Sequence, residues 1–386
     1  MINFEFVSPT KIYFGRKQEE NIGKILNDYG YKNILFHYGQ TSIFKSGLYE
    51  RVVNSLNEYS INYIELGGVL PNPKIDLVRK GVEIVKNNNI ELVLAVGGGS
   101  VIDSAKSIAC GAKVDFDPWL FNLHQKIPKE VLPVATILTI SAAGSELSNS
   151  CVISNLESNI KNGFNSDLIR PIFSILNPEL TFSVSPYQTA CGIVDILMHT
   201  LERYFNDVKN SYFTDEIALG LIKATIKSGL IVMKNPQDYE ARASLMIASS
   251  YSHNGLTGLG TKMYFTVHKL EHILSGMHDE VAHGAGLAIL FPAWAKYTKD
   301  LLIDKWTRLG LAIGIKDDEE IVDNTIDYFY NLFKDLNMPV SLTEVNVSEN
   351  EFEEFATRAT NNINNCVLGV KNIFKEDVIA ILKLAK

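Results

Sequence analysis

The stretch ELVLAVGGGSVIDSAKSIA, residues 91–109, decides the fold of the first half of the chain. An apolar run that ends at Val96 is typical of a strand buried on both faces, and three glycines then lead into Ser100 and a helical pattern. Glycines let a backbone approach a ligand closely, and the first N–H groups of a helix favour a phosphate. The stretch therefore predicts a strand, a phosphate-binding turn and a helix. The spacing differs from the GxGxxG fingerprint, and a tight turn capped by Ser100 is the alternative interpretation.

The same alternation continues on both sides of this stretch. Apolar runs at 32–39, 61–68, 131–140 and 171–178 predict further strands, and helical spacing separates several of them. This order predicts a doubly wound, mainly parallel sheet in an α/β dinucleotide-binding domain. After residue 183 only helical patterns follow, which predicts a second, all-helical domain.

We therefore divide the chain into a dinucleotide-binding domain over 1–183 and a metal-binding, catalytic domain over 184–386. A length of 386 residues favours two domains, because single cores rarely grow beyond about 250–300 residues. Ligands of open α/β sheets bind beyond the carboxyl ends of the strands, so we expect the chemistry in a crevice between the two domains.

Composition excludes several classes of protein. Apolar residues make up 46% of the chain and charged residues 21%, which is typical of ordinary globular proteins. Acidic residues outnumber basic ones by 44 to 36, and no basic stripe is present, so we expect no nucleic-acid partner. No apolar stretch reaches the roughly 18 residues of a membrane span, and the start MINFEFVSPT lacks a secretion signal. We expect a cytoplasmic protein without a membrane partner.

A second polar turn follows the predicted strand at 131–140. The segment TILTISAAGSELSN brings Thr139, Ser145 and Asn149 to the carboxyl end of that strand. Serine and glycine are common in every turn, so this signal is weak alone. Two such turns on neighbouring strands indicate a cofactor site more strongly than either one.

Histidines at helical spacing predict a metal site in the second half. In GIVDILMHTLERY, Asp195 and His199 stand four residues apart, and His268 and His272 repeat this spacing before His283. An intrahelical hydrogen bond is the alternative for each pair taken alone. A carboxylate on so apolar a helix would be costly without a cation. Imidazoles with one carboxylate suit iron, zinc, nickel or cobalt, and ligand type does not choose among these ions.

Several motifs together resemble one known family. PTKIYFG, PNP at 71–73, GGGSVIDSAK, AAGSELSNSCVISN, the D-x-x-x-H helix and HGAGLAI resemble the iron-containing (group III) alcohol dehydrogenases over nearly the whole chain. YGQTSIFKSGLYERV and LEHILSGMHD are similar to segments of its butanol dehydrogenase branch. The architecture this implies is the two-domain plan that dehydroquinate synthase also has.

The resemblance implies roles for particular residues. One divalent metal, Fe²⁺ by the family's name, with Zn²⁺, Ni²⁺ or Co²⁺ as alternatives, would be bound by Asp195, His199, His268 and His283. His272 would be a neighbour rather than a ligand, and we assign it the catalytic task of passing a proton. The cofactor would contact Gly39, Ser42, Asn72, Gly98, Gly99, Ser100, Asp103, Thr139, Ser145, Asn149 and Lys161.

Three departures from the family pattern stand out. Ala143 replaces a hydroxyl residue near the cofactor, and the interval between His272 and His283 is one residue longer than the pattern. The turn after the second strand begins with Gly39 and carries no carboxylate before Glu50. An acidic residue there would bind the ribose hydroxyls and repel a 2′-phosphate, so its absence favours NADP(H) over NAD(H).

The predicted activity is hydride transfer between nicotinamide and a primary alcohol or aldehyde of the butanol and butanal type. The first alternative is a glycerol or polyol dehydrogenase with NAD and zinc. A dehydroquinate synthase-like lyase would need several basic residues near the metal, where Lys262 and Lys269 are the main ones. A non-catalytic dinucleotide-binding protein would not need the ligand set. The resemblance also implies a homodimer, and His278 is left without a role.

Overall fold

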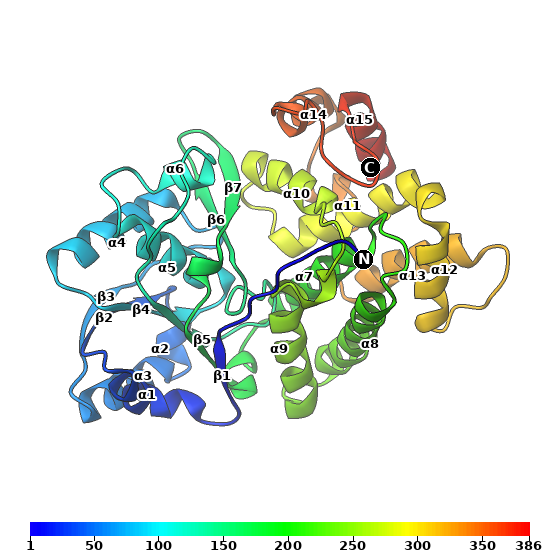
Figure 1. Cartoon of the computed structure of the whole chain (residues 1–386). Coiled ribbons are helices and arrows are strands. Elements are labelled where there is room, and N and C mark those ends of the chain that lie inside the picture. Colours follow the sequence, from blue (N-terminus) through cyan, green and yellow to red (C-terminus); the bar gives the residue numbers. More distant parts are fainter. The chain divides into compact units, whose positions relative to one another are not determined.

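The structure is a computed structural model that describes residues 1–386 and contains two compact units (Figure 1). One unit is Val7–Val184, and the other is Ser185–Lys386 together with Met1–Phe6. The predicted range 1–183 included the first six residues, which the structure groups with the helical unit instead. Their attachment is visible in the backbone, because the N–H of Ile2 donates to the carbonyl of Gly260 at 2.9 Å.

The unit Val7–Val184 is built on a six-stranded sheet in the order β1-β8-β5-β4-β2-β3. Its strands are β1 (Lys11–Phe14), β2 (Asn33–Tyr38), β3 (Asn62–Leu66), β4 (Leu92–Gly97), β5 (Val134–Leu138) and β8 (Phe173–Leu176). Every neighbouring pair is parallel, with Tyr38 opposite Val96 and Gly97 opposite Leu138. The predicted doubly wound α/β fold is confirmed.

Helices cover both faces of this sheet. They are α1 (Ile22–Tyr29), α2 (Ser42–Lys45), α3 (Leu48–Glu58), α4 (Ile75–Asn87), α5 (Gly99–Gly111) and α6 (Trp119–Asn122). Ile34 and Phe36 belong to the apolar cluster that α1 and α3 complete, whereas His37 faces the other way and contacts Ser104 of α5. Successive residues of a strand point to opposite faces, so a strand covered on both faces is buried along its length, as β4 is throughout and β2 is at its four central residues.

Three strands of the structure, β1, β6 and β7, were not predicted from the sequence. β1 is short and lies before the first predicted strand, and it is partly exposed at the edge of the sheet. β6 (Ser150–Asn155) and β7 (Ile160–Asn165) form a separate antiparallel hairpin, with Cys151 opposite Phe164. Their polar composition, SCVISN and IKNGFN, lacks the apolar run or regular alternation that predicts a strand.

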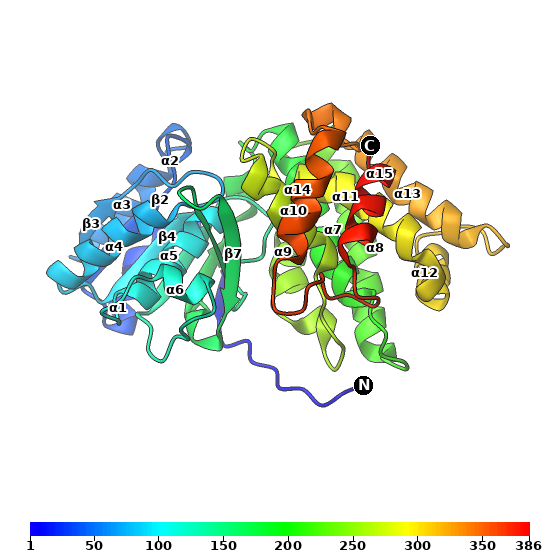
Figure 2. The same cartoon turned by 90° about the horizontal axis from the view of Figure 1, so that it is seen from above.

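The helical unit confirms the expected absence of strand and helix alternation in the second half (Figure 2). Its helices are α7 (Pro186–Tyr204), α8 (Tyr212–Lys234), α9 (Tyr239–His253), α10 (Thr266–Met277), α11 (His283–Thr298), α12 (Ile303–Ala312), α13 (Ile321–Asp335), α14 (Phe352–Thr360) and α15 (Lys375–Leu384). α7 is buried from Thr189 to Tyr204, and α11 is buried on nearly all sides. No helix of the chain combines the length and the apolar character needed to span a bilayer.

Candidate metal centre and cofactor turns

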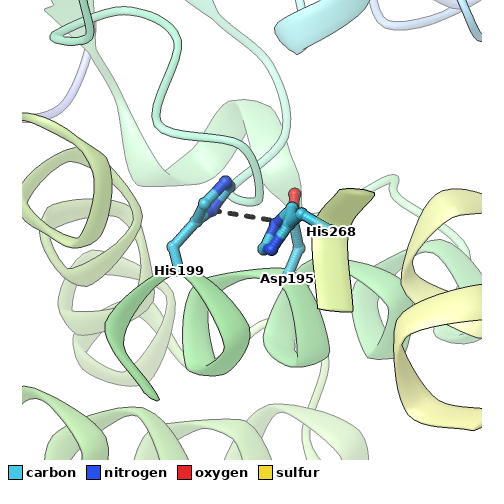
Figure 3. Close-up of side chains that lie close together, drawn as sticks. All are labelled: Asp195, His199 and His268. Atoms are coloured by element: carbon cyan, nitrogen blue, oxygen red, sulfur yellow. Dashed lines mark ion pairs between the residues drawn. The ribbon is translucent and has the colours of Figure 1, made fainter. Parts of the chain in front are cut away.

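Three polar side chains meet inside the helical unit. Asp195 and His199 lie one turn apart on α7, and His268 reaches them from α10 (Figure 3). One ligand atom from each lies within 4.8 Å of the others, and all three residues are buried. A helix stacks residues four apart on one face, so α7 presents two ligands to the same point.

Asp195 is the centre of this cluster. Its Oδ1 lies 3.4 Å from Nδ1 of His199, 3.6 Å from Nε2 of His268 and 3.7 Å from Nε2 of His283. The rings of His199 and His268 stack with their centroids 4.6 Å apart. His283, at the first residue of α11, thus faces the same oxygen, although it is more exposed than the other three.

The chemistry of this cluster fits a metal ion. Oδ1 of Asp195, Nδ1 of His199 and Nε2 of His268 are buried and have no hydrogen-bond partner. Buried polar atoms are almost always paired, so three converging ligand atoms without hydrogen-bond partners form an arrangement that a shared cation would satisfy. Nitrogen and oxygen donors of this kind suit a first-row divalent metal.

Two buried carboxylates lie behind the histidines. Nδ1 of His268 bonds to Glu202, and Nδ1 of His283 bonds to Glu271. Burial lowers the pKa of His268, but Glu202 and Asp195 outweigh it and raise the pKa to about 9. His199 has no such carboxylate, and burial with nearby His253 lowers its pKa well below the usual value.

Two glycines of HGAGLAI bring α11 close to its neighbours. A Cβ on Gly284 would lie 2.6 Å from Cα of Cys191 on α7, so only glycine allows this approach. A Cβ on Gly286 would lie 2.9 Å from Cγ of Glu271. The motif therefore makes room for the contact of α11 with α7 and for the carboxylate that bonds to His283.

The remaining histidines of the region have different surroundings. The half-buried ring of His272 lies 5.9 Å from the ring of His283. His253, for which the sequence analysis gives no role, packs its ring 4.0 Å from that of His199. Nε2 of His278, which had no predicted role, lies 2.8 Å from Glu351.

The glycine turn after β4 has the predicted form. Gly98 is extended, α5 starts at Gly99, and the carbonyl of Gly98 accepts the N–H groups of Val101 and Ile102. A Cβ on Gly98 would collide with Ile140, and one on Gly99 would lie 2.9 Å from Cβ of Ala143. The first N–H groups of α5, including that of Ser100, have no acceptor within the helix and can bind a phosphate.

Gly39 lies beside this turn. An added Cβ there would be 3.8 Å from Val101 of α5 and would meet no closer atom. Ser42, three residues on, begins α2 and is exposed. The turns after β2 and β4 therefore lie together at the carboxyl edge of the sheet.

Two buried side chains of α5, Lys106 and Asp103, bond to the turn after β5. The ammonium of Lys106 donates to the carbonyls of Ser145, Ser148 and Ser150 at 2.7–2.9 Å. Asp103 accepts the hydroxyl of Ser145 at 2.5 Å, and burial raises the pKa of its carboxyl while Lys106 opposes the rise. The Asp103 carboxylate also accepts the N–H of Val152, and its predicted contact with the cofactor stays a prediction.

The other predicted cofactor residues lie after β5, before β6, before α4 and on β7. The N–H of Thr139 donates to the carbonyl of Gly97 at 3.1 Å, and the side-chain amide of Asn149 donates to Asp167 at 3.1 Å. Asn72 adopts a positive φ of 52° in the loop before α4. Lys161 lies on β7, opposite Ser154, and is close enough to Asp103 to influence its carboxyl.

The fold and these two sites define a class of protein, the metal-dependent oxidoreductases that use a nicotinamide dinucleotide. The model of iron-containing alcohol dehydrogenases matches residues 9–178, and that of the C-terminal part of the Fe-containing alcohol dehydrogenase family matches 189–386. This chain belongs to the iron-containing alcohol dehydrogenase family, as its motifs predict.

Individual relatives agree with this assignment. The chain is 43% identical to the NADH-dependent butanol dehydrogenase A of Clostridium acetobutylicum, with 99% of each chain covered. It is 32% identical to the NADPH-dependent aldehyde reductase YqhD of Escherichia coli, with 89% of each covered. The crystal structure of the NADH-dependent butanol dehydrogenase A of Thermotoga maritima superposes with a TM-score of 0.96 at 36% identity, covering 100% of this chain and 99% of that one.

Proposed function

We propose that this chain is a metal-dependent, NAD(P)H-linked alcohol dehydrogenase that interconverts short primary alcohols and aldehydes of the butanol and butanal type. The observation that carries the proposal is the convergence of Asp195, His199 and His268, whose buried ligand atoms have no partner. His283 faces the same carboxylate and would complete the ligand set. The relatives named as butanol dehydrogenases support a short primary alcohol of the butanol type as the substrate.

A divalent metal held by these residues would supply Lewis acidity toward the oxygen of the alcohol or aldehyde, and a bound nicotinamide would carry the hydride. The protein would position both groups. The first N–H groups of α5 would bind the phosphates of the cofactor, and Asp195 with three imidazoles would bind the metal.

We assign His272 to proton transfer with the substrate oxygen. Its ring is half-buried and adjoins His283, but it does not belong to the cluster around Asp195. His272→Ala should lower kcat by about a hundredfold or more and leave the metal content unchanged, since a positioned acid or base contributes about 10²–10⁴-fold. Unchanged kcat with a full metal complement would remove His272 from the mechanism.

The preferred cofactor is proposed from the turn after β2. Gly39 and its neighbours place no carboxylate where it would repel a 2′-phosphate, and this favours NADPH. The name of the Clostridium relative favours NADH, and that of the Escherichia coli relative favours NADPH. We propose that NADPH is preferred, which requires a higher kcat/KM with NADPH than with NADH.

One set of measurements tests the activity. The protein is purified without oxygen and its metal is identified. Oxidation of NADH and NADPH is then followed with aldehydes of rising chain length, and reduction of NAD⁺ and NADP⁺ is followed with butanol and with glycerol. Butanal reduction that is lost with a chelator and restored by Fe²⁺ or Zn²⁺ supports the proposal. Turnover of glycerol in preference to butanol would favour a polyol dehydrogenase.

We also propose that the protein is a cytoplasmic homodimer. Sedimentation of the purified protein would test the dimer, and cell fractionation would test the location.

A further inference from the structure

We propose that Glu202 and Glu271 are positioning residues that set the metal affinity of the centre, each by fixing one histidine. This inference rests on the proposed function, because it concerns the metal that the function requires. The two carboxylates lie on the far side of the imidazoles from Asp195, and neither is among the proposed ligands.

The contacts leave one nitrogen of each ring for a ligand. Glu202 bonds to Nδ1 of His268, and Glu271 bonds to Nδ1 of His283. A carboxylate accepts a hydrogen bond, so the ring proton belongs on Nδ1 and the lone pair on Nε2. These are the nitrogens that face Oδ1 of Asp195, at 3.6 and 3.7 Å.

The two pairs also connect the three helices in a ring. Glu202 of α7 holds the histidine of α10, and Glu271 of α10 holds the histidine of α11. Both histidines then face Asp195, back on α7. A carboxylate of α7 therefore orients the histidine of α10, and a carboxylate of α10 orients the histidine of α11. The ligand set thus depends on the packing of all three helices.

The two carboxylates differ in what else they bond. Glu202 also accepts the backbone N–H groups of Val267 and His268, at 2.6 and 3.1 Å, in the first turn of α10. It thus caps a helix as well as orienting a ligand, and its loss would affect folding. Glu271 has zero exposed area and also accepts the hydroxyl of Ser275 on its own helix, so we use it for the main test.

The burial of these carboxylates makes a purely structural role a poor explanation. Buried negative charges are costly unless they are paired, and each of these carboxylates bonds, besides its other partners, to the imidazole of a residue that faces Asp195. Charge on the carboxylate raises the basicity of the imidazole and so strengthens its bond to a cation.

The experiment measures metal affinity directly in the full-length protein. Metal-free protein is titrated with Co²⁺ in competition with a chelator, and binding is read from the visible absorption of Co²⁺ rather than from turnover. Glu271→Gln should weaken the affinity by about 10–100-fold and alter the Co²⁺ spectrum, since the neutral amide holds the ring less firmly. Glu271→Ala should weaken it further.

A second variant reaches the same carboxylate without changing it. Gly286→Ala places a Cβ against Cγ of Glu271, at 2.9 Å, and should displace the carboxylate from His283. Its metal affinity should fall, as that of Glu271→Gln should.

The matched control is Asp215→Asn, which changes a buried carboxylate of the same unit that pairs with Lys305 and Arg308. It should lower thermal stability and leave Co²⁺ affinity unchanged.

The outcomes separate this inference from the proposed function. Wild-type protein that binds no Co²⁺ overturns both. If the wild type binds Co²⁺ and Asp195→Ala does not, but Glu271→Gln and Gly286→Ala bind it as tightly as the wild type, the positioning role is wrong and the metal centre stands. Equal losses in Asp215→Asn would also overturn the role, because they would show a general effect of instability.

Discussion

The two proposed ligand sites of this chain are built in opposite ways. The cofactor turns use backbone N–H groups and glycines that are contiguous in sequence, as in Gly97–Ser100 after β4. The metal centre uses side chains from α7, α10 and α11, with Asp195 and His283 separated by 88 positions in the numbering. A site made of backbone is visible in one short segment, whereas a site made of side chains exists only after the helices pack.

Both proposed sites nevertheless have buried charged side chains bonded to the residues that would hold the ligand. In the sheet unit the charge is positive, because Lys106 gathers the carbonyls of the turn after β5. In the helical unit it is negative, because Glu202 and Glu271 hold imidazoles. The sign follows from the partner, since carbonyl oxygens need donors and imidazole N–H groups need acceptors.

The largest expected effect tests the side-chain site at its centre. Asp195→Ala should remove activity and lower metal affinity by more than the roughly 10–100-fold expected of the supporting carboxylates, since three histidines face this one residue. Metal analysis and butanal reduction check it. Asp323→Ala, an exposed carboxylate paired with Lys299, is the control and should change neither. Full metal content in Asp195→Ala would refute the ligand assignment.

Lys106→Met is the corresponding test on the sheet unit. Three carbonyls and Asp103 would lose their buried cation, which should cost about 3–5 kcal/mol in the free energy of unfolding. The KM for the cofactor should rise as the turn after β5 loosens. Denaturant unfolding and steady-state kinetics check both effects. Lys113→Met, a surface residue near Glu130, should leave them unchanged; a similar loss there would contradict a special role for Lys106.

A buried histidine outside the metal centre gives the sheet unit a pH dependence of its own. His37 bonds to the carbonyl of Leu66 and to Ser104, and burial lowers its pKa from 6.5 to about 4. The unfolded chain binds a proton more readily between these values, so stability is full above pH 6.5 and falls as the pH drops toward about 4, by about 3 kcal/mol in all.

Unfolding by denaturant at about pH 4.5 and about pH 7 measures this loss, since the two values lie on either side of most of the transition. His37→Gln removes the titrating group and should flatten the difference between the two values. His124→Gln, which changes an exposed histidine of the same unit, should keep it. An equal pH dependence in wild type and His37→Gln would assign the effect to other groups.

The smallest expected effect concerns the backbone-built site. Gly39→Asp adds a carboxylate beside the turn after β4, where an added Cβ meets no atom closer than 3.8 Å. It should lower kcat/KM with NADPH by about tenfold, or about 1.4 kcal/mol, and leave NADH nearly unaffected. Gly39→Asn controls for size without charge. Equal losses with both cofactors would mean that Gly39 does not face the 2′ position.

Particular residues show how far the sequence could be read. Continuous apolar runs predicted β2, β4, β5 and β8, because a parallel sheet buried on both faces needs them. The hairpin of β6 and β7 was missed, since polar residues and glycine interrupt its few apolar ones and neither strand shows a long apolar run. Spacing of four residues proposed Asp195 with His199, but no local pattern marks Glu202, Glu271, Lys106 or His253 as part of a site.

The sequence by itself determined the parallel α/β sheet, the glycine turn at 97–99 and the family, because periodicity, backbone freedom and motif order are local properties. Only the tertiary structure decided which atoms meet. It brought Nε2 of His268 and of His283 toward Asp195, and it placed the Asp103 carboxylate under a turn, bonded to Ser145. Such contacts arise when helices and turns pack to satisfy buried polar groups, and a one-dimensional pattern does not contain that pairing.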